Sequence, residues 1–133
     1  MTDTVPVGNA YDKYASSNPI ERRLMARFLD HLDASLPSRA PDRVLEVGIG
    51  EGEISERVKR HYPDADVVGL DLPDAALAEH WRARALSAAF GDIVALPFPD
   101  RSFDLVLAIE VLEHVPDPDA ALTEIARVSR SGV

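Results

Sequence analysis

Residues 44–52 read Val-Leu-Glu-Val-Gly-Ile-Gly-Glu-Gly, a short apolar run with one carboxylate, followed by glycines at alternate positions. A helical pattern begins directly after them. Glycine adopts positive φ angles and has no Cβ, so a backbone rich in glycine can bend sharply and lie against a ligand. The stretch therefore predicts a strand, a tight turn and the start of a helix, with a ligand close to the turn.

Strand and helix patterns alternate on both sides of this turn. Asn18, Pro19 and Glu21 predict a helix start, and apolar residues at three- and four-residue steps continue it to Leu36. This order predicts an α/β fold: a Rossmann-like, mostly parallel sheet with flanking helices. The apolar run at 103–109 predicts a central strand buried on both faces, reached by a connection without a helix. Further helices are expected at 53–62, from 73–74 to about 84 and after Asp117, and the other strands at 43–47, 66–70 and 86–90.

The composition excludes several classes of protein. The chain has 133 residues, no cysteine and a formal net charge of −9. We expect one domain without disulfides, and the charge argues against nucleic acid as a partner. No apolar run reaches the roughly 20 residues of a membrane span, and the N-terminus lacks a signal-peptide pattern. A soluble, cytoplasmic protein is expected, with no metal site, because the histidines at 31, 61 and 80 lie in helical patterns.

Three acidic residues lie at or near the ends of the first three predicted strands. Glu46 is near the end of the first strand, Asp71 ends the second and Asp92 follows the third. The carboxyl ends of parallel strands meet at one edge of the sheet, where such folds bind their ligands. Each residue alone has a structural alternative: a turn cap for Glu46, a loop start for Asp71 and an ordinary turn for Asp92. Together with the glycine turn they predict a binding site.

The charges around the turn bear on the kind of ligand. A dinucleotide-binding turn needs glycines at 48, 50 and 53, whereas position 53 is Glu and the third glycine is Gly52. Glu51 and Glu53 at the helix start would repel a pyrophosphate. A nucleoside without phosphate and with a cationic tail fits this turn better. S-adenosylmethionine has ribose hydroxyls, an adenine amino group, an ammonium and a sulfonium.

Four segments, in order, resemble the motifs of the class I S-adenosylmethionine-dependent methyltransferases. They are 44–52, with the pattern E-x-G-x-G-x-G, then Gly-Leu-Asp-Leu at 69–72, then 91–98 and 103–115. The resemblance covers about residues 40–133 and is greatest to the small-molecule branch that includes ubiquinone-biosynthesis-type enzymes. It implies a class I methyltransferase core that transfers a methyl group from S-adenosylmethionine to a small-molecule acceptor.

The resemblance implies roles for the residues near the methionine end of the cofactor. Gly48, Gly50 and Gly52 would let the backbone approach the methionine moiety. Glu46 would orient the ammonium group, directly or through water. The backbone at Ile109 would border the same end of the cofactor.

The resemblance also assigns the nucleoside end. Asp71 would accept hydrogen bonds from both ribose hydroxyls, and Leu72 follows it in the same motif as part of the cofactor site. Asp92 would accept a hydrogen bond from the adenine amino group, and the Ile93 N–H would donate one to a ring nitrogen.

The acceptor side has fewer assignments. His114 is the candidate general base, needed only for a poorly ionised hydroxyl or a protonated amine, and its alternative is a structural loop histidine. Glu110 is a candidate substrate contact. Tyr11 and Tyr14 would line the pocket if the N-terminal segment folds over it, as it often does in the family, or would anchor the first helix. The sequence does not specify the acceptor or the methylated atom.

We expect residues 1–38 to cover the cofactor and substrate site and residues 39–133 to form the S-adenosylmethionine-binding core. The usual seven-stranded sheet would lack its last three strands, which makes the core incomplete at the C-terminus and the strand at 103–109 an edge. A truncated product, an expressed fragment, a split enzyme or a chain completed by a partner would each fit. A second copy or a partner chain is expected to cover this edge.

Two other functions stay open. The first is a catalytically incomplete S-adenosylmethionine-binding module or subunit that needs a partner. The second is an NAD-dependent oxidoreductase, which the acidic residues of the turn disfavour.

Overall fold

The computed structural model describes residues 17–131 of the chain. The chain divides into two units, Met1–Arg39 and Ala40–Val133. The first unit contains helix α1 (Pro19–Ser35), which starts as predicted, because the Asn18 side chain accepts a hydrogen bond from the Ile20 N–H at 2.9 Å. No side chain of α1 is buried.

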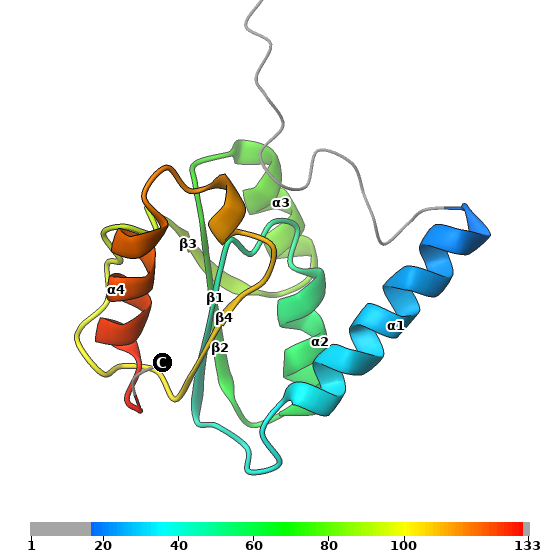
Figure 1. Cartoon of the computed structure of the whole chain (residues 1–133), viewed down its shortest axis with the longest axis horizontal. Coiled ribbons are helices and arrows are strands. Elements are labelled where there is room, and N and C mark those ends of the chain that lie inside the picture. Colours follow the sequence, from blue (N-terminus) through cyan, green and yellow to red (C-terminus); the bar gives the residue numbers. More distant parts are fainter. Residues whose placement is uncertain (1–16, 132–133) are drawn as a thin grey trace, which may run out of the picture. The chain divides into compact units, whose positions relative to one another are not determined.

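The second unit is a four-stranded parallel sheet in the order β3-β2-β1-β4, with helices on both faces (Figure 1). The predicted α/β class is confirmed, and the strand boundaries differ from the expected ones by no more than two residues. Residues 91–104 join β3 to β4 across the sheet without a helix, as predicted. In chain order the elements are β1 (Arg43–Val47), α2 (Glu53–His61), β2 (Asp66–Asp71), α3 (Ala75–Ala83), β3 (Ser87–Phe90), β4 (Leu105–Ala108), the short 3-10 helix η2 (Leu112–His114) and α4 (Pro118–Val128).

The register brings the carboxyl ends of the strands to one edge of the sheet, the upper edge in Figure 1. Val47 of β1 lies opposite Leu70 of β2 and Ala108 of β4, and Asp71 lies opposite Phe90 of β3. The chain moves outward from β1 to β2 and β3, and then returns to the other side of β1. The order therefore reverses between β1 and β4, which is where open parallel sheets bind their ligands.

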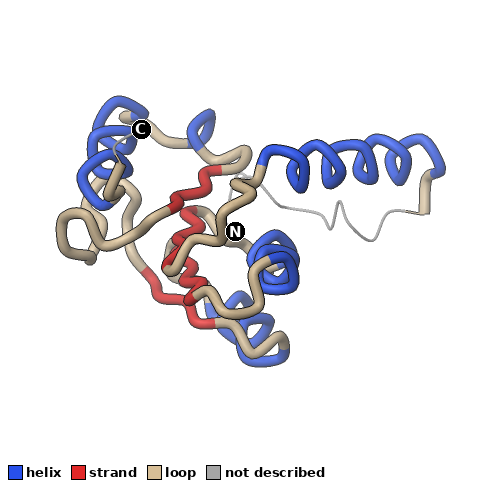
Figure 2. The backbone as a smooth tube through the Cα atoms, turned by 90° about the horizontal axis from the view of Figure 1, so that it is seen from below, coloured by secondary structure: helices blue, strands red, loops and turns tan. Residues whose placement is uncertain are grey.

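Different helices cover the two faces of the sheet. Figure 2 shows α4 on one side of the strands and α2 and α3 on the other. Residues 44–47 of β1 are all buried, because this strand has a neighbour on each side and helices on both faces. The cluster under α4 includes Leu45, Val47, Ala121, Ile125 and Val128.

β4 differs from the expected central strand. Its four residues, 105–108, are half-buried, and among the described residues it pairs with β1 alone. The prediction of a central strand buried on both faces is wrong for this sheet, whereas the expectation that this strand is an edge is confirmed among the described residues. An apolar run indicates a strand that packs against other elements, but it does not report how many strands lie beside it. Phe103, just before β4, is fully buried, and its backbone pairs with Ser129 after α4.

Candidate functional site

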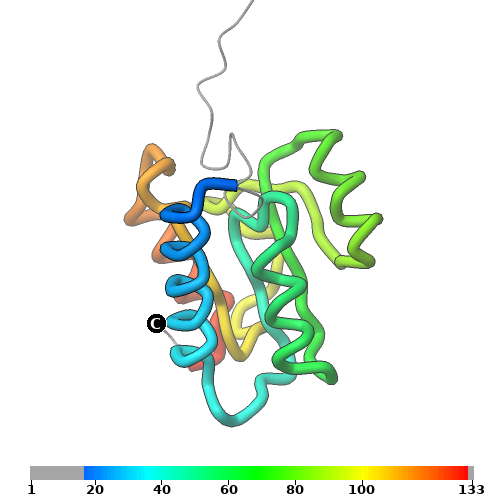
Figure 3. The backbone as a smooth tube through the Cα atoms, turned by 90° about the vertical axis from the view of Figure 1, so that its right-hand side faces the viewer, coloured from blue at the N-terminus to red at the C-terminus, as the bar shows by residue number. Residues whose placement is uncertain are grey.

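The glycine turn, residues 48–52, joins the carboxyl end of β1 to the start of α2 (Figure 3). Its three glycines have φ angles of 71°, 57° and 98° in chain order, which explains why glycine occupies these positions. The N–H groups of Gly48 and Ile49 both donate to the Leu70 carbonyl, at 2.8 and 3.1 Å. The turn is therefore hydrogen bonded to the end of the neighbouring strand, β2.

Side chains from other elements occupy the space that a Cβ would need at two of these glycines. A Cβ on Gly48 would lie 2.6 Å from Cγ2 of Val111, and a Cβ on Gly52 would clash with the side chain of Leu86. Any other residue at either position would push these neighbours away. The glycines thus let Val111 and Leu86 pack on the turn, in addition to the close ligand approach that the sequence predicts for them.

Asp71, the last residue of β2, binds the turn through its carboxylate. Oδ2 accepts the Gly50 N–H at 2.7 Å, and Oδ1 accepts the N–H of Leu72 at 2.8 Å. Each carboxylate oxygen has a second lone pair, which can accept a hydrogen bond from a ligand hydroxyl. Leu72 is 52% exposed, so an apolar surface lies next to this carboxylate.

The carbonyl of Gly50 is hydrogen bonded as well. Nε1 of Trp81, on α3, donates to it at 2.7 Å, and Trp81 is 5% exposed. The indole also packs against Phe90, with 5.2 Å between the ring centroids. Side chains of β2 and α3 therefore fix both polar backbone groups of the central glycine.

Glu46 is buried rather than available at the surface of the site, with 3% of its area exposed. Its Oε1 accepts the Ser55 hydroxyl at 2.6 Å, and the Ser55 backbone also hydrogen bonds the carboxyl group. Burial raises the pKa of Glu46 from 4.5 to about 8, and the Asp71 carboxylate adds to this rise. At neutral pH Glu46 is therefore mostly protonated, and it ties the first turn of α2 to β1.

Asp92 follows the end of β3, next to Asp71. The Gly91 N–H donates to the Asp71 carbonyl at 2.9 Å, which keeps this segment beside the end of β2. Asp92 is exposed, and its Oδ1 accepts the Val94 N–H at 3.1 Å. Ile93 is buried in the core cluster, so it anchors the segment that presents the Asp92 carboxylate.

The charges at the start of α2 are more balanced than the sequence suggests. Arg84, which follows α3, forms ion pairs with Glu53 and, at 3.1 Å, with Glu56. His80 lies 3.7 Å from Glu51, with Nε2 facing Oε1. The expected repulsion of a pyrophosphate by Glu53 is therefore weakened, because Arg84 pairs with that carboxylate as well as with Glu56. The glycine spacing still departs from the dinucleotide pattern.

The segment after β4 reaches the turn through Val111. Ile109 is half-buried directly after the strand, and Glu110 has a positive φ of 53°, which redirects the chain. Val111 then packs on Gly48. His114 ends η2 with an exposed side chain, and its Nε2 lies 3.7 Å from Oε1 of the adjacent Glu113.

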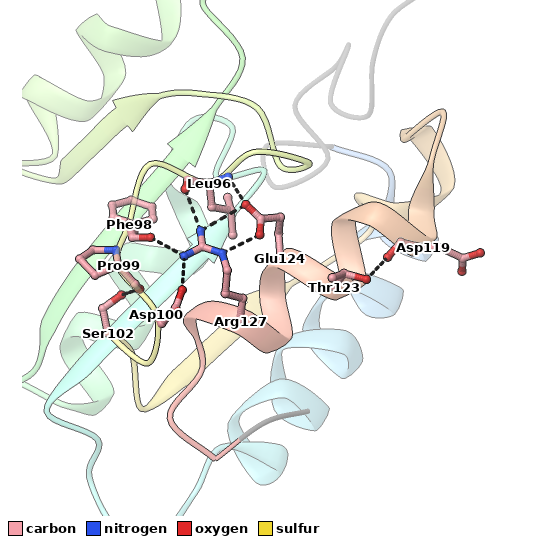
Figure 4. Close-up of polar contacts among 9 residues, drawn as sticks. All are labelled: Leu96, Phe98, Pro99, Asp100, Ser102, Asp119, Thr123, Glu124 and Arg127. Carbon is pink, nitrogen blue, oxygen red and sulfur yellow. Dashed lines mark hydrogen bonds and ion pairs between the residues drawn. The ribbon is translucent and has the colours of Figure 1, made fainter.

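Arg127 of α4 binds the loop between β3 and β4, as Figure 4 shows. Its guanidinium donates to the carbonyls of Leu96 and Phe98, both at 2.9 Å, and to Asp100 at 2.8 Å. Glu124 accepts from Arg127 at 2.6 Å and from the Leu96 N–H at 2.8 Å. The guanidinium holds the pKa of Glu124 below its usual value. This cluster fixes the loop that continues from Asp92.

Tyr11 and Tyr14, the two other candidate substrate residues, lie outside the described residues. Within residues 17–131, no group of three or more His, Asp or Glu side chains could hold a metal ion. No helix of that range is long and apolar enough to cross a bilayer.

Residues 45–133 match the family model of a methyltransferase domain. The chain belongs to this methyltransferase family. The domain is 37% identical over 114 residues to 27-O-demethylrifamycin SV methyltransferase of Amycolatopsis mediterranei, covering 80% of this chain and 41% of the relative. It is also 37% identical over 112 residues to ubiquinone biosynthesis O-methyltransferase of Hahella chejuensis, covering 78% and 45%. The chain thus spans less than half the length of these two curated relatives.

Solved structures share the fold of this methyltransferase domain. The [4+2]-cyclase SpnF matches with a TM-score of 0.71 and 27% identity, over 91% of this chain and 45% of the other. A chain in the complex between the Haloferax volcanii Trm112 methyltransferase activator and a putative methyltransferase matches with a TM-score of 0.67 and 30% identity, over 82% and 51%. The resemblance to class I methyltransferases is confirmed, and these comparisons give no support to an oxidoreductase.

The sequence patterns assign no role at the site to three residues around the glycine turn: Ser55, Trp81 and Arg84. Ser55 lies in the first turn of α2, where hydroxyl residues commonly satisfy free polar groups, so its position offered a signal. Trp81 and Arg84 bind partners 31 and 28 or more residues away. No local spacing rule predicts such contacts.

Proposed function

We propose that this methyltransferase domain binds S-adenosylmethionine at the carboxyl edge of its sheet and serves the transfer of a methyl group to a small-molecule acceptor. The Asp71 carboxylate carries the proposal. It lies at the end of β2, is hydrogen bonded to the glycine turn and keeps acceptor positions for two ribose hydroxyls. The family match and the names of the two relatives support the same activity.

The nucleoside end would be held beside the ends of β2 and β3. Leu72 offers an exposed apolar surface next to Asp71 for the flat base. The Asp92 carboxylate is exposed and can accept from the adenine amino group, while the Ile93 N–H would donate to a ring nitrogen. The loop clamped by Arg127 keeps this segment in place.

The methionine end would lie against the glycine turn, with Gly48, Gly50 and Gly52 and the backbone at Ile109 around it. Glu46 acts there indirectly: its buried, mostly protonated carboxyl group fixes the start of α2 through Ser55. Because Glu46 is buried and mostly protonated, we do not propose a direct ion pair between it and the ammonium group.

A bound S-adenosylmethionine supplies a methyl group on a sulfonium, which is already a strong electrophile. The contribution of the chain is then mainly to hold the acceptor in line with that methyl group, where positioning can supply several kcal/mol. His114, exposed beside Glu113, is the residue proposed to take a proton from a hydroxyl or ammonium acceptor. Glu110, Tyr11 and Tyr14 are proposed as acceptor contacts.

Calorimetric titration with S-adenosylmethionine, S-adenosylhomocysteine and NAD tests the cofactor assignment. We expect the first two ligands to bind and NAD not to bind. Asp71→Asn should weaken binding by about tenfold or more, because the amide loses half of the acceptor capacity and the charge-assisted hydrogen bonds. The matched control is Asp66→Asn, an exposed aspartate at the other end of β2 that pairs with Arg43.

Binding of NAD without binding of S-adenosylmethionine would overturn the proposed cofactor. Equal losses in the Asp71 and Asp66 variants would remove the ribose assignment.

Cofactor binding alone does not establish methyl transfer, since a structural neighbour with this fold is titled a cyclase. We therefore propose a second measurement, in which methyl-labelled S-adenosylmethionine is incubated with the protein and a panel of phenols, quinols, amines and carboxylic acids. Label in an organic product supports transfer. Binding without any transfer would favour the second candidate function.

That second candidate is a cofactor-binding module that works with a partner chain or a second copy. The outer side of β4 carries no paired strand among the described residues, and one structural neighbour comes from a complex with a methyltransferase activator. Sedimentation of the protein, alone and with candidate partners, tests this alternative. A monomer that turns over alone would exclude it.

A further inference from the structure

The central residue of the glycine turn is fixed from two directions. The Gly50 N–H donates to Asp71 Oδ2 at 2.7 Å, and the Gly50 carbonyl accepts from Trp81 Nε1 at 2.7 Å. One partner comes from the end of β2 and the other from α3. Trp81 therefore helps to fix the turn that would lie against the cofactor, although it has no role in the proposed function.

The Trp81 bond has the properties of a conformational lock. Gly50 has a φ of 57°, a conformation that glycine exchanges easily with others when nothing holds it. The indole is 5% exposed, so water cannot readily replace it as the donor. If the Trp81 N–H is removed, the Gly50 carbonyl loses its hydrogen-bond donor. A rearranged turn in which water reaches this oxygen then becomes more favourable.

We propose that Trp81 is a positioning residue that keeps the glycine turn in its ligand-binding conformation through the bond to the Gly50 carbonyl. The inference rests on the proposed function, because it concerns the affinity of the same site. A protein that holds its competent conformation for only a fraction of the time binds with an affinity reduced by that fraction. Trp81 raises that fraction without needing to touch the ligand.

The chain has a single tryptophan, which allows a test that changes one hydrogen-bond donor and little else. Replacing Trp81 with β-(3-benzothienyl)alanine substitutes sulfur for the N–H and keeps the fused ring that packs against Phe90. We expect the dissociation constant for S-adenosylhomocysteine to rise about tenfold, as it does when the competent fraction falls to about a tenth. Trp81→Phe serves as a second, encoded variant, measured at a temperature where it is fully folded.

The matched control is Ser102→Ala. The Ser102 side chain is buried, and its hydroxyl also donates to a backbone carbonyl, that of Pro99, at 2.8 Å, but it lies away from the turn. Its loss should lower the melting temperature as the Trp81 replacement does. A merely structural role for Trp81 would make the two variants alike, with ligand affinity unchanged in both.

Hydrogen exchange of the Gly50 amide gives a readout that does not depend on the ligand. If Trp81 locks the turn, this amide should exchange several-fold faster in the benzothienyl variant, while amides in α4 remain as slow as in the parent chain. Faster exchange with weaker S-adenosylhomocysteine binding supports the inference. Unchanged exchange, or unchanged affinity in a parent chain that binds, would overturn it. A parent chain that does not bind S-adenosylhomocysteine at all would instead overturn the proposed function.

Discussion

Glu46 and Asp71 show how two carboxylic acids at one end of a sheet acquire different properties from their surroundings. Glu46 is 3% exposed and has a pKa of about 8, so it is mostly neutral and serves as a buried hydrogen-bond partner for Ser55. Asp71 is half-buried, and its carboxylate accepts hydrogen bonds from two backbone N–H groups. Both were predicted as cofactor residues; the burial of Glu46 argues against a direct contact, and Asp71 stays the proposed ribose partner.

The buried Glu46 predicts a specific dependence of stability on pH. The pKa is 4.5 in its ordinary state and about 8 in the folded chain, so between these values the folded state keeps a proton that the unfolded state has lost. Raising the pH through this window therefore lowers the free energy of unfolding. Glu46→Gln stays neutral and can still accept from Ser55. The difference in free energy of unfolding between this variant and the parent should shift in favour of the variant by about 2 kcal/mol or more from pH 5 to pH 8.

Urea unfolding at several pH values measures this difference. Glu79→Gln, the same change at an exposed position of α3, is the matched control. A gap between parent and Glu46→Gln that stayed constant from pH 5 to pH 8 would contradict the prediction.

At the scale of elements, α4 and the loop between β3 and β4 behave as one unit. The single guanidinium of Arg127 donates to two loop carbonyls and to the carboxylates of Asp100 and Glu124 (Figure 4). Glu124 also accepts a hydrogen bond from the Leu96 N–H. The loop has no helix or strand of its own between β3 and β4. Its conformation therefore depends on a side chain about thirty residues further along the chain.

Arg127→Lys should destabilise the domain by about 1–2 kcal/mol, because an ammonium cannot reproduce the planar fork that reaches several acceptors at once. Arg130→Lys is the control, since the Arg130 guanidinium donates to the Arg101 carbonyl and to Asp104, and its side chain is more exposed than that of Arg127. Guanidinium chloride unfolding of both variants gives the comparison. Equal, small losses of unfolding free energy in the two variants would show that the loop does not need the planar guanidinium of Arg127.

At the scale of the whole molecule, the hydrophobic core belongs to one of the two units. The buried cluster runs from Leu45 to Val128, entirely within Ala40–Val133. The helix of the other unit, α1, has no buried side chain. Leu36, which follows this helix, is buried but lies outside that cluster, so we predict that the sheet folds without residues 1–39.

A chain shortened to residues 40–133 should accordingly unfold in one cooperative transition, within a few degrees of the parent, because it keeps the whole buried cluster. Circular dichroism during heating measures this. A broad melt without a transition would contradict the prediction. The same shortened chain tests the expected covering role of residues 1–38, since loss of acceptor binding with retained cofactor binding would support it.

The sequence predicts most of the fold because its signals are local. The alternation of apolar runs with capped helices indicates β1, β2 and β3 and the caps Asn18 and Asp117. Asp71 is predicted correctly at the end of its strand for the same reason. The burial of Glu46 depends on which elements become neighbours, which no local pattern reports. The contact of Trp81 with the turn is missed on the same ground.

The strand order has a consequence for how the sheet can assemble. β1 lies between β2 and β4, pairing Val44 with Val67 on one side and with Leu105 on the other. The pairing of β1 with β2 closes a short loop of the chain. The pairing of β1 with β4 closes a longer loop, which contains α2, β2, α3 and β3, and therefore costs more chain entropy. During synthesis on the ribosome, therefore, β1 emerges early but cannot complete its hydrogen bonds until β4 has been synthesised as well.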